Sequence, residues 1–369
     1  MNPNNILINR NDLKNLLLVI LILILGVGVT NNFDYEAYSM SYSNLIETNF
    51  EKGYRFIENF FYSKGVHFNL FKAIIIGTSI FIILKLSNRY LPKKSKYIYY
   101  IIFMIYPLSF FAYSLRTTIA TAFLYIGIIL LIEKVRFSNL LFILLIYLAS
   151  LFHISIVFFG IYLIIPILTK FINNRKDILT FNLVFTVIIS LMIILSLNEV
   201  LLQYFIDLIW GLLSGIFNIS SAKEDYITIS GNYGYLLFVI SNVLFFITFI
   251  IIKNYILKYK YTELDKLESN KKKYIFIEYA YLISLILFFL APLLKVNTEF
   301  SRIYKIIFPI FISASILGVS IMKRCKERTI VKILIVITTV YCFIIYVLPY
   351  FHDILLPMIT DNWIFTKLK

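Results

Sequence analysis

The chain has 369 residues, of which 60% are hydrophobic, and its formal net charge is +15. A mean hydropathy of +0.85 excludes a soluble globular protein, because no soluble core could hide that much apolar surface. The basic residues lie mostly in short loops between apolar runs. The positive charge is therefore explained by the orientation of the protein in the membrane, and a nucleic-acid partner is not predicted.

Apolar stretches recur along the chain and predict transmembrane helices. A helix needs about 20 residues to cross about 30 Å of hydrocarbon. The stretches that read as single spans lie at residues 15–30, 70–86, 179–198, 234–252, 274–294, 303–322 and 329–350.

Two further apolar blocks, residues 97–132 and 137–169, are too long for one helix each. Each is predicted to form a hairpin, because polar or helix-breaking residues interrupt it near the middle. Pro107 and Arg116 interrupt the first block, and His153 interrupts the second. The prediction is an all-α polytopic bundle of about eleven spans, forming a single integral membrane domain over residues 1–369.

The distribution of basic residues predicts the orientation. Of the 35 Lys and Arg residues, 24 fall in alternate loops, as expected for cytoplasmic loops. The N-terminus is therefore predicted to be cytoplasmic and the C-terminus extracytoplasmic. Residues 31–69 and 199–233 form the larger extracytoplasmic segments, within which 200–219 is expected to be a re-entrant or interfacial helix.

The lysine-rich loop at 253–273 is predicted to be cytoplasmic and to meet anionic lipid headgroups. The abundance of Ile, Lys, Asn, Phe and Tyr fits an AT-rich bacterial genome and favours a multi-pass protein of the bacterial cytoplasmic membrane.

Arg116 is unusual because it lies in an apolar hairpin with no acidic residue within four positions. It therefore needs a distant partner or an anionic ligand. A planar guanidinium suits a phosphate or pyrophosphate, and the alternative is an interfacial arginine that extends to the membrane surface.

His153 and Arg302 are expected near the same external face. His153 could act as a general base or as a donor to phosphate; the alternative is a helix-end histidine bonded to a backbone carbonyl. Arg302 opens the tenth span and could bind an anion, or form a salt bridge with Glu299 three residues earlier.

The first external segment combines acidic, aromatic and basic side chains: Asp34, Tyr35, Glu36, Tyr38, Glu51, Tyr54 and Arg55. Asp34 and Glu36 lie two positions apart, and carboxylates at that spacing could share a divalent cation or activate a sugar hydroxyl. The tyrosines could stack on sugar rings. The alternative is an ordinary aromatic belt with an acidic external loop. No zinc, nucleophile-elbow or nucleotide-binding motif is found, so neither a metal nor a cofactor is predicted.

These elements, in their order and spacing, resemble the EpsG family of bacterial exopolysaccharide proteins, relatives of the Wzy polysaccharide polymerases. Thr117 departs from the family pattern, because a glutamine is more usual there. The matching elements are Asp34 and Tyr38 after the first span, Glu51-Lys52-Gly53-Tyr54, Leu115-Arg116-Thr117-Thr118-Ile119-Ala120, Ser150-Leu151-Phe152-His153-Ile154-Ser155, and Ser301-Arg302-Ile303-Tyr304.

The resemblance implies a polymerase that joins oligosaccharide repeat units carried on undecaprenyl pyrophosphate at the outer leaflet, with a GT-C-like fold as one form of the architecture. Arg116 and Arg302 would bind the pyrophosphate, and His153, Asp34 or Glu51 would orient or deprotonate the acceptor hydroxyl. The other partners implied are the lipid bilayer, a flippase and a chain-length regulator.

Three other functions fit the same chain. A flippase for lipid-linked oligosaccharides predicts functional charge at several depths in the membrane. A transferase using a polyprenyl phosphosugar predicts that Asp34 and Glu36 are the essential acidic pair. A scaffold subunit predicts that Arg116 and His153 are dispensable.

Overall fold

A computed structural model describes residues 10–31, 34–43, 49–171, 175–198, 200–202, 204, 207, 232–259, 268–290 and 301–367. Throughout these residues the regular secondary structure is helical, and an isolated bridge between Val29 and Asn362 is their one β interaction. The prediction of an all-helical protein is confirmed for this part of the chain.

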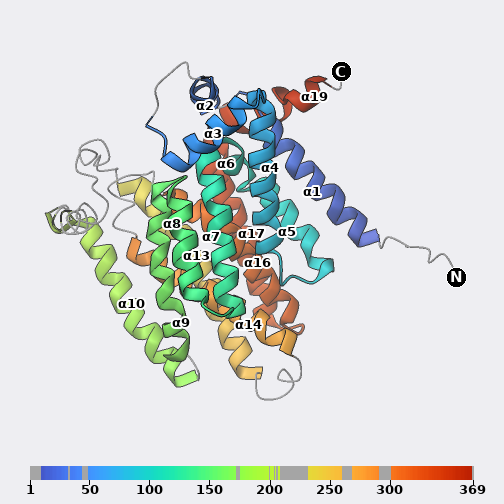
Figure 1. Ribbon diagram of the computed structural model, residues 1–369. Helices are drawn as coiled ribbons and strands as arrows, with labels where there is room; N and C mark the ends of the chain where they lie inside the picture. The colour runs from blue at the N-terminus through green and yellow to red at the C-terminus, as the bar shows by residue number, and fades with distance from the viewer. Residues whose placement is uncertain are drawn as a thin grey trace. The chain divides into compact units, whose positions relative to one another are not determined.

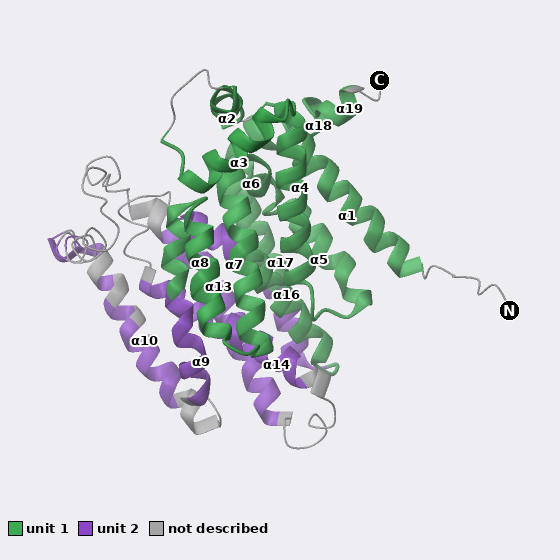
Figure 2. Cartoon of the chain, viewed as in Figure 1, with its two compact units in different colours: residues 1–160, 308–324, 335–369 green, residues 161–307, 325–334 purple. Residues whose placement is uncertain are grey.

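The chain divides into two compact units (Figure 2). Unit 1 comprises residues 1–160, 308–324 and 335–369, and unit 2 comprises residues 161–307 and 325–334. The predicted single membrane domain stays a prediction. In unit 1, or mostly in it, are α1 (Arg10–Gly28), α2 (Tyr35–Tyr42), α3 (Lys52–Ser63), α4 (Phe68–Ser87), α5 (Lys93–Ile105), α6 (Leu108–Tyr113), α7 (Leu115–Glu133), α8 (Ser138–Ser150), η1 (Ile154–Ile164), α16 (Arg302–Ile321), α17 (Lys326–Tyr346), η5 (Leu348–Tyr350), η6 (Phe351–Leu355), α18 (Pro357–Thr360) and α19 (Trp363–Lys367).

In unit 1, α7 is the central helix, and α4, α6 and α8 pack against it (Figure 1). Its side chains are almost all apolar or small, and most of them are buried. α1 packs on α4, α5 and α6, and its C-terminal end also contacts α18 and α19.

Unit 2 is built from α9 (Ile165–Leu168), η2 (Thr169–Phe171), α10 (Arg175–Leu197), α13 (Asn232–Tyr259), α14 (Glu268–Ile286) and η3 (Leu287–Leu290). Buried polar contacts join its helices, since Asn242 Nδ2 donates to the Ser284 carbonyl over 2.9 Å. Lys253 Nζ lies 2.9 Å from Glu278 Oε1. Pairing of this kind reduces the cost of placing a charge among apolar helices.

Within the described residues, six helices are long and apolar enough to cross a membrane: α1, α4, α7, residues Leu236–Lys258 of α13, α16 and α17. On α17, Ile333, Val336, Ile337, Val340 and Ile344 are exposed along one face. This spacing makes an apolar stripe, as expected for a helix that faces acyl chains. The structure is that of a helical membrane protein.

The chain breaks where the two hairpins were predicted. The first block divides into α5, α6 and α7 around Pro107 and Ser114, and the second divides at Leu151–His153 between α8 and η1. α5 and α8 have 13 residues each, which gives about 20 Å of helix, less than the hydrocarbon thickness. The count of eleven spans and the sides of the termini therefore stay predictions.

Two predicted segments extend outside the described residues. Most of 199–233, including most of the proposed re-entrant helix at 200–219, lies outside them. In the predicted loop 253–273, α13 continues to Tyr259 and α14 begins at Glu268, and the residues between these helices are not described.

Candidate functional site

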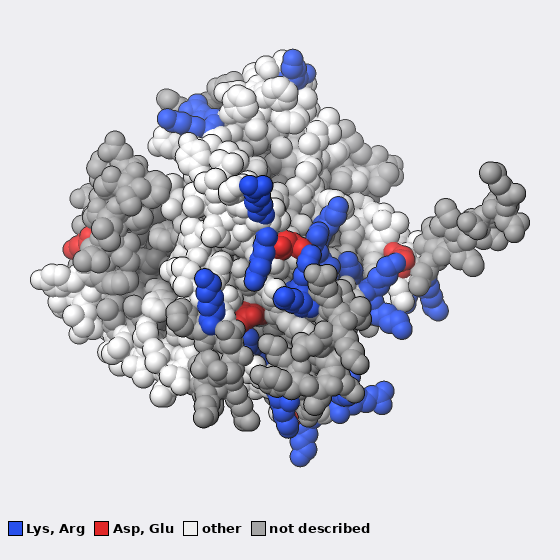
Figure 3. Space-filling model, turned by 60° about the horizontal axis from the view of Figure 1, so that its bottom comes forward, with Lys and Arg blue, Asp and Glu red and all other residues white. Residues whose placement is uncertain are grey.

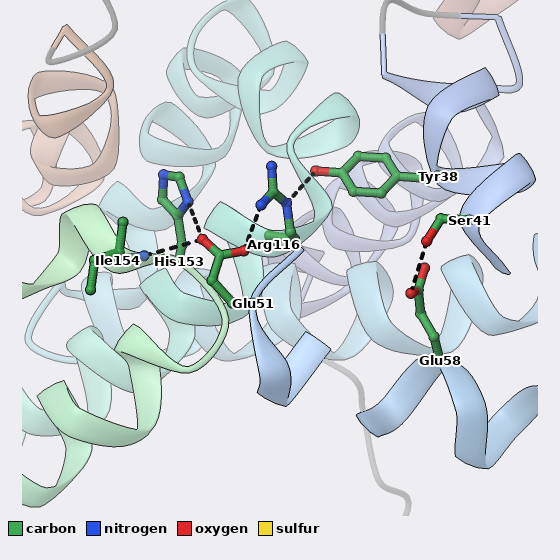
Figure 4. A network of polar contacts seen from close by, with 7 residues as sticks. All are labelled: Tyr38, Ser41, Glu51, Glu58, Arg116, His153 and Ile154. Atoms are coloured by element: carbon green, nitrogen blue, oxygen red, sulfur yellow. Dashed lines mark hydrogen bonds and ion pairs between the residues drawn. The ribbon is translucent and has the colours of Figure 1, made fainter. Parts of the chain in front are cut away.

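Arg116 lies at the N-terminal end of α7, as the second residue of the helix. Its side chain is 22% exposed. Arg116 Nη1 donates to Glu51 Oε2 over 2.5 Å, and Nε donates to the Tyr38 hydroxyl over 3.3 Å (Figure 4). The distant partner that the sequence required is therefore the carboxylate of Glu51. In the described part of the chain, Arg116 Nη2 makes no hydrogen bond.

Glu51 precedes the first residue of α3, where the backbone is extended, and it joins two side chains that are far apart in sequence. Its Oε2 accepts from Arg116, and its Oε1 lies 3.4 Å from His153 Nδ1. The backbone nitrogen of Ile154 donates to the same Oε1 over 3.3 Å. Both carboxylate oxygens are thus occupied, and Glu51 fixes the relative positions of Arg116 and His153 (Figure 4).

A close backbone approach places Glu51 between these groups. The Gly53 nitrogen donates to the Leu151 carbonyl over 2.9 Å, which ties the start of α3 to the turn after α8. A Cβ on residue 53 would lie 2.7 Å from the Leu151 oxygen and 2.8 Å from the Leu151 Cβ. Only glycine permits this distance, which explains the residue type in the Glu51-Lys52-Gly53-Tyr54 element.

Aromatic rings surround the guanidinium of Arg116. Its Cζ lies 4.3 Å from the centre of the Phe50 ring and 5.9 Å from that of Tyr38. The Tyr54 ring contacts both Tyr38 and Phe50 and is fully buried. Cation–π contacts stabilise the charge without neutralising it. Tyr54 is therefore a buried residue that packs against the aromatic rings around Arg116.

The electrostatics keep Glu51 ionised. Burial tends to raise the pKa of this carboxyl, but the nearby imidazole of His153 and the charge of Arg116 lower it, and the net result is a pKa below the ordinary value. The pKa of the Tyr38 phenol is raised, chiefly by burial, so this phenol stays protonated at neutral pH. The cluster thus pairs an anionic carboxylate with a permanent cation.

A second carboxylate, Glu58, lies two turns further along α3. It is 4% exposed, and its Oε2 accepts from the Ser41 hydroxyl over 3.1 Å. Burial raises its pKa to about 7. The sequence prediction missed Glu58, although helical spacing places it on the same buried face as Tyr54.

The other predicted site residues occupy varied positions. Asp34 lies at the N-cap of α2, and the Tyr35 hydroxyl donates to Asn69 Oδ1 over 2.6 Å. Glu36 and Arg55 are exposed. Arg302 is the first residue of α16 and belongs to unit 2, and its proposed partner Glu299 lies outside the described residues.

Phe50 and Lys72 were also missed. Phe50 could not be identified from the sequence, because aromatic residues are common in loops at the membrane surface. Lys72 is fully buried in α4, where its Nζ contacts the Val29 carbonyl and faces the Tyr35 ring at 5.2 Å. A lone lysine within an apolar span is the signal that could have identified it.

The cluster and the basic loops lie at opposite ends of α4 and α7. Both helices run from the cluster toward exposed basic residues, which are Lys85 in the last turn of α4, Arg89 after α4, and Lys134 and Arg136 after α7. Figure 3 shows Lys and Arg side chains at the surface of this opposite end. There, Glu133 accepts from Arg89 Nε over 3.2 Å and joins the two loops.

Among the described residues, no three His, Cys, Asp or Glu side chains are grouped so as to hold a metal ion. The cluster itself contains a guanidinium, an imidazole and a phenol. Together they can bind an anion and move a proton.

The fold and the cluster define an integral helical membrane protein in which loop and helix-end residues build one polar centre at the end opposite the basic loops. The chain belongs to the EpsG family, whose model matches residues 15–357, nearly the whole chain. The resemblance seen in the sequence elements is thereby confirmed. No curated protein and no solved structure matches the chain. EpsG-like proteins are Wzy-type polymerases, and the chain is a membrane protein of polysaccharide biosynthesis.

Proposed function

We propose that the protein is a polymerase that joins oligosaccharide repeat units, carried on undecaprenyl pyrophosphate, into capsular polysaccharide or exopolysaccharide. The observation that carries the proposal is the Arg116–Glu51–His153 cluster in a chain of the EpsG family. An anion-binding group and a proton acceptor held by one carboxylate are what transfer from a pyrophosphate donor requires.

The proposed location is the outer face of the cytoplasmic membrane. Positively charged loops stay on the cytoplasmic side, and the cluster lies at the other end of α4 and α7 from the loops that carry Arg89 and Arg136. Lipid-linked repeat units at the outer leaflet would meet the cluster there.

In the proposed step, the acceptor hydroxyl oxygen forms a bond to the anomeric carbon of the donor sugar. The bond from that carbon to the pyrophosphate oxygen breaks, and its electron pair leaves with the polyprenyl pyrophosphate. Arg116 Nη2 stabilises the charge that develops on this leaving group. The energy comes from the sugar–pyrophosphate bond, so the step needs no nucleotide.

His153 is the proposed base. Its Nδ1 faces the ionised Glu51 at 3.4 Å, so Nδ1 carries the proton and Nε2 is left to accept one from the acceptor hydroxyl. Glu51 is a positioning residue in this scheme, because its lowered pKa and two occupied oxygens make it a poor base. Arg302 is proposed to bind pyrophosphate as well.

The test is the size distribution of lipid-linked saccharides from cells that carry Arg116→Ala. We expect long polymer to fall at least about tenfold and single repeat units to accumulate at the outer leaflet. Arg116→Lys should recover little, because an ammonium lacks the planar set of donors. Arg89→Ala, at the opposite end of α4, is the matched control.

Normal polymer in the Arg116→Ala strain would refute the proposal and support a scaffold. Repeat units retained at the inner leaflet would indicate a flippase instead. Loss of product in Glu36→Gln but not in Arg116→Ala would indicate a polyprenyl-phosphosugar transferase.

A further inference from the structure

A polar cavity of about 340 Å³ lies in unit 1, between the start of α2 and the C-terminal turns. Its volume is at the lower end of the range of about 300 to 1,000 Å³ for ligand pockets. Three segments far apart in sequence line it: Thr30, Asn31, Tyr35, Glu36, His352, Asp353 and Pro357.

We propose that this cavity binds a neutral sugar of the lipid-linked repeat unit, as a subsite separate from the Arg116 cluster. The inference rests on the proposed function for its substrate class. It adds the turn η6 and the start of α18 to the substrate-binding surface.

The cavity wall is held in place before any ligand binds. The Thr30 hydroxyl donates to the Asp361 carbonyl over 2.6 Å, and Asn31 Nδ2 donates to Asp361 Oδ2 over 3.2 Å. The Tyr35 hydroxyl is fixed by Asn69. A wall ordered in this way loses little conformational entropy on binding.

The lining selects against anions. Glu36 and Asp353 are exposed, and within the described residues neither carboxylate has a side-chain hydrogen bond or ion pair. Ionised carboxylates only accept hydrogen bonds, so they favour sugar hydroxyls and repel a pyrophosphate. No Lys or Arg lines the cavity to offset their charge.

The helix α2 connects the cavity to the catalytic cluster. Tyr35 and Glu36 line the cavity, and Tyr38 binds Arg116 Nε. Tyr35 and Tyr38 are about one helical turn apart, and three residues of helix rise about 4.5 Å. The cavity and the cluster are thus joined through a single turn of α2.

The probe for the test is the oligosaccharide that mild acid releases from lipid-linked repeat units of a strain lacking the protein. Binding to the full-length protein in detergent is measured by saturation-transfer NMR. The double variant Glu36→Gln/Asp353→Asn should bind at least tenfold more weakly. Asp12→Asn alters a partly exposed carboxylate in the first turn of α1 that pairs with Lys93; it is the control and should bind normally.

The Arg116→Ala variant separates this inference from the proposed function. We expect it to bind the oligosaccharide normally, because the cavity does not include Arg116. If Arg116→Ala cells made normal polymer while the cavity variant lost binding, the polymerase proposal would fail and the saccharide site would stand. Unchanged binding in the cavity variant, or no binding to the unmodified protein, would overturn the inference.

A second readout uses the unmodified protein and does not depend on the folding of variants. Carbodiimide modifies accessible carboxylates, and the oligosaccharide should protect Glu36 and Asp353 from it at least tenfold, whereas inorganic pyrophosphate should not. If Ca²⁺ or Mg²⁺ alone protected both carboxylates and the oligosaccharide did not, the cavity would be a cation site and the proposal would be wrong.

Discussion

Glu51 contacts both Arg116 and His153, so one carboxylate positions two different functional groups. It lies 65 positions from Arg116 in sequence, and the charge of that arginine balances its own. Removing the charge would leave the Arg116 guanidinium partly buried without its counterion, which is costly. It would also free the His153 ring to rotate.

Glu51→Gln should therefore reduce polymer formation at least about tenfold without removing a group that contacts the sugar. The amide keeps the shape of the side chain but not the charge that orients His153. The measurement is the yield of long polymer across a pH series, in which the optimum should shift for Glu51→Gln. Glu133→Gln, which alters a carboxylate bonded to Arg89 and Tyr90 at the opposite end, should leave both yield and optimum unchanged.

Glu58 predicts a pH dependence of stability. Its pKa in the folded protein is about 7, above the ordinary value of 4.5. A raised pKa means that Glu58 supports folding fully below pH 4.5, and that this support is lost as the pH rises through 7. The difference corresponds to roughly 3 kcal/mol.

The thermal unfolding midpoint of the detergent-solubilised protein should therefore fall between pH 5 and pH 8. Glu58→Gln should show a smaller fall and be the more stable protein at pH 8. Equal pH profiles for the two proteins would mean that Glu58 is ionised in the folded state.

At the scale of elements, the turn between α8 and η1 and the start of α3 form one joint. The Gly53–Leu151 contact holds them, and Glu51 and His153 lie beside it. The cluster's geometry therefore depends on a backbone contact that carries no charge and no catalytic group.

Gly53→Ala should disrupt this joint. A Cβ at 2.7 Å from the Leu151 oxygen forces the backbones apart and should cost about 1 to 3 kcal/mol. We expect a lower unfolding midpoint and a loss of long polymer similar to that of Glu51→Gln. Gly160→Ala is the control, since its added Cβ meets no atom within 4 Å; equal behaviour of the two variants would argue against the joint.

Sequence patterns predicted the helices well, because apolar composition and length determine which segments can be buried in lipid. They also predicted that the chain breaks near Arg116 and His153, where polar groups interrupt apolar runs. They could not identify Glu51 as the shared partner. That contact depends on how closely Gly53 approaches Leu151 and not on spacing along the chain. The cavity at Asp353 likewise depends on segments that are far apart in sequence, whereas the buried position of Glu58 follows from its helical spacing with Tyr54.

For the whole molecule, the positions of the cluster and the basic loops predict which residues are accessible from each side of the membrane. Lys64 lies between α3 and the start of α4, which is the end of α4 on the side of the cluster, and Lys134 follows the opposite end of α7; both are exposed. In a background with Cys325 and Cys342 changed to serine, Lys64→Cys should react with an impermeant maleimide added to intact cells. Lys134→Cys should react only after the membrane is permeabilised, and the reverse pattern would contradict the proposed orientation.

The bridge between Val29 and Asn362 joins the first membrane helix to the C-terminal turns, and it has a consequence for biosynthesis. The hydrogen bond from Thr30 to Asp361 joins residues 331 positions apart. At about 5 to 20 residues per second, the ribosome needs roughly 15 to 70 s to translate this interval, and the bond cannot form earlier. Until then the Gly28 surface that receives the Asn362 side chain stays uncovered in the growing chain. Unit 1 is thus among the first parts to enter the membrane and among the last to finish assembling.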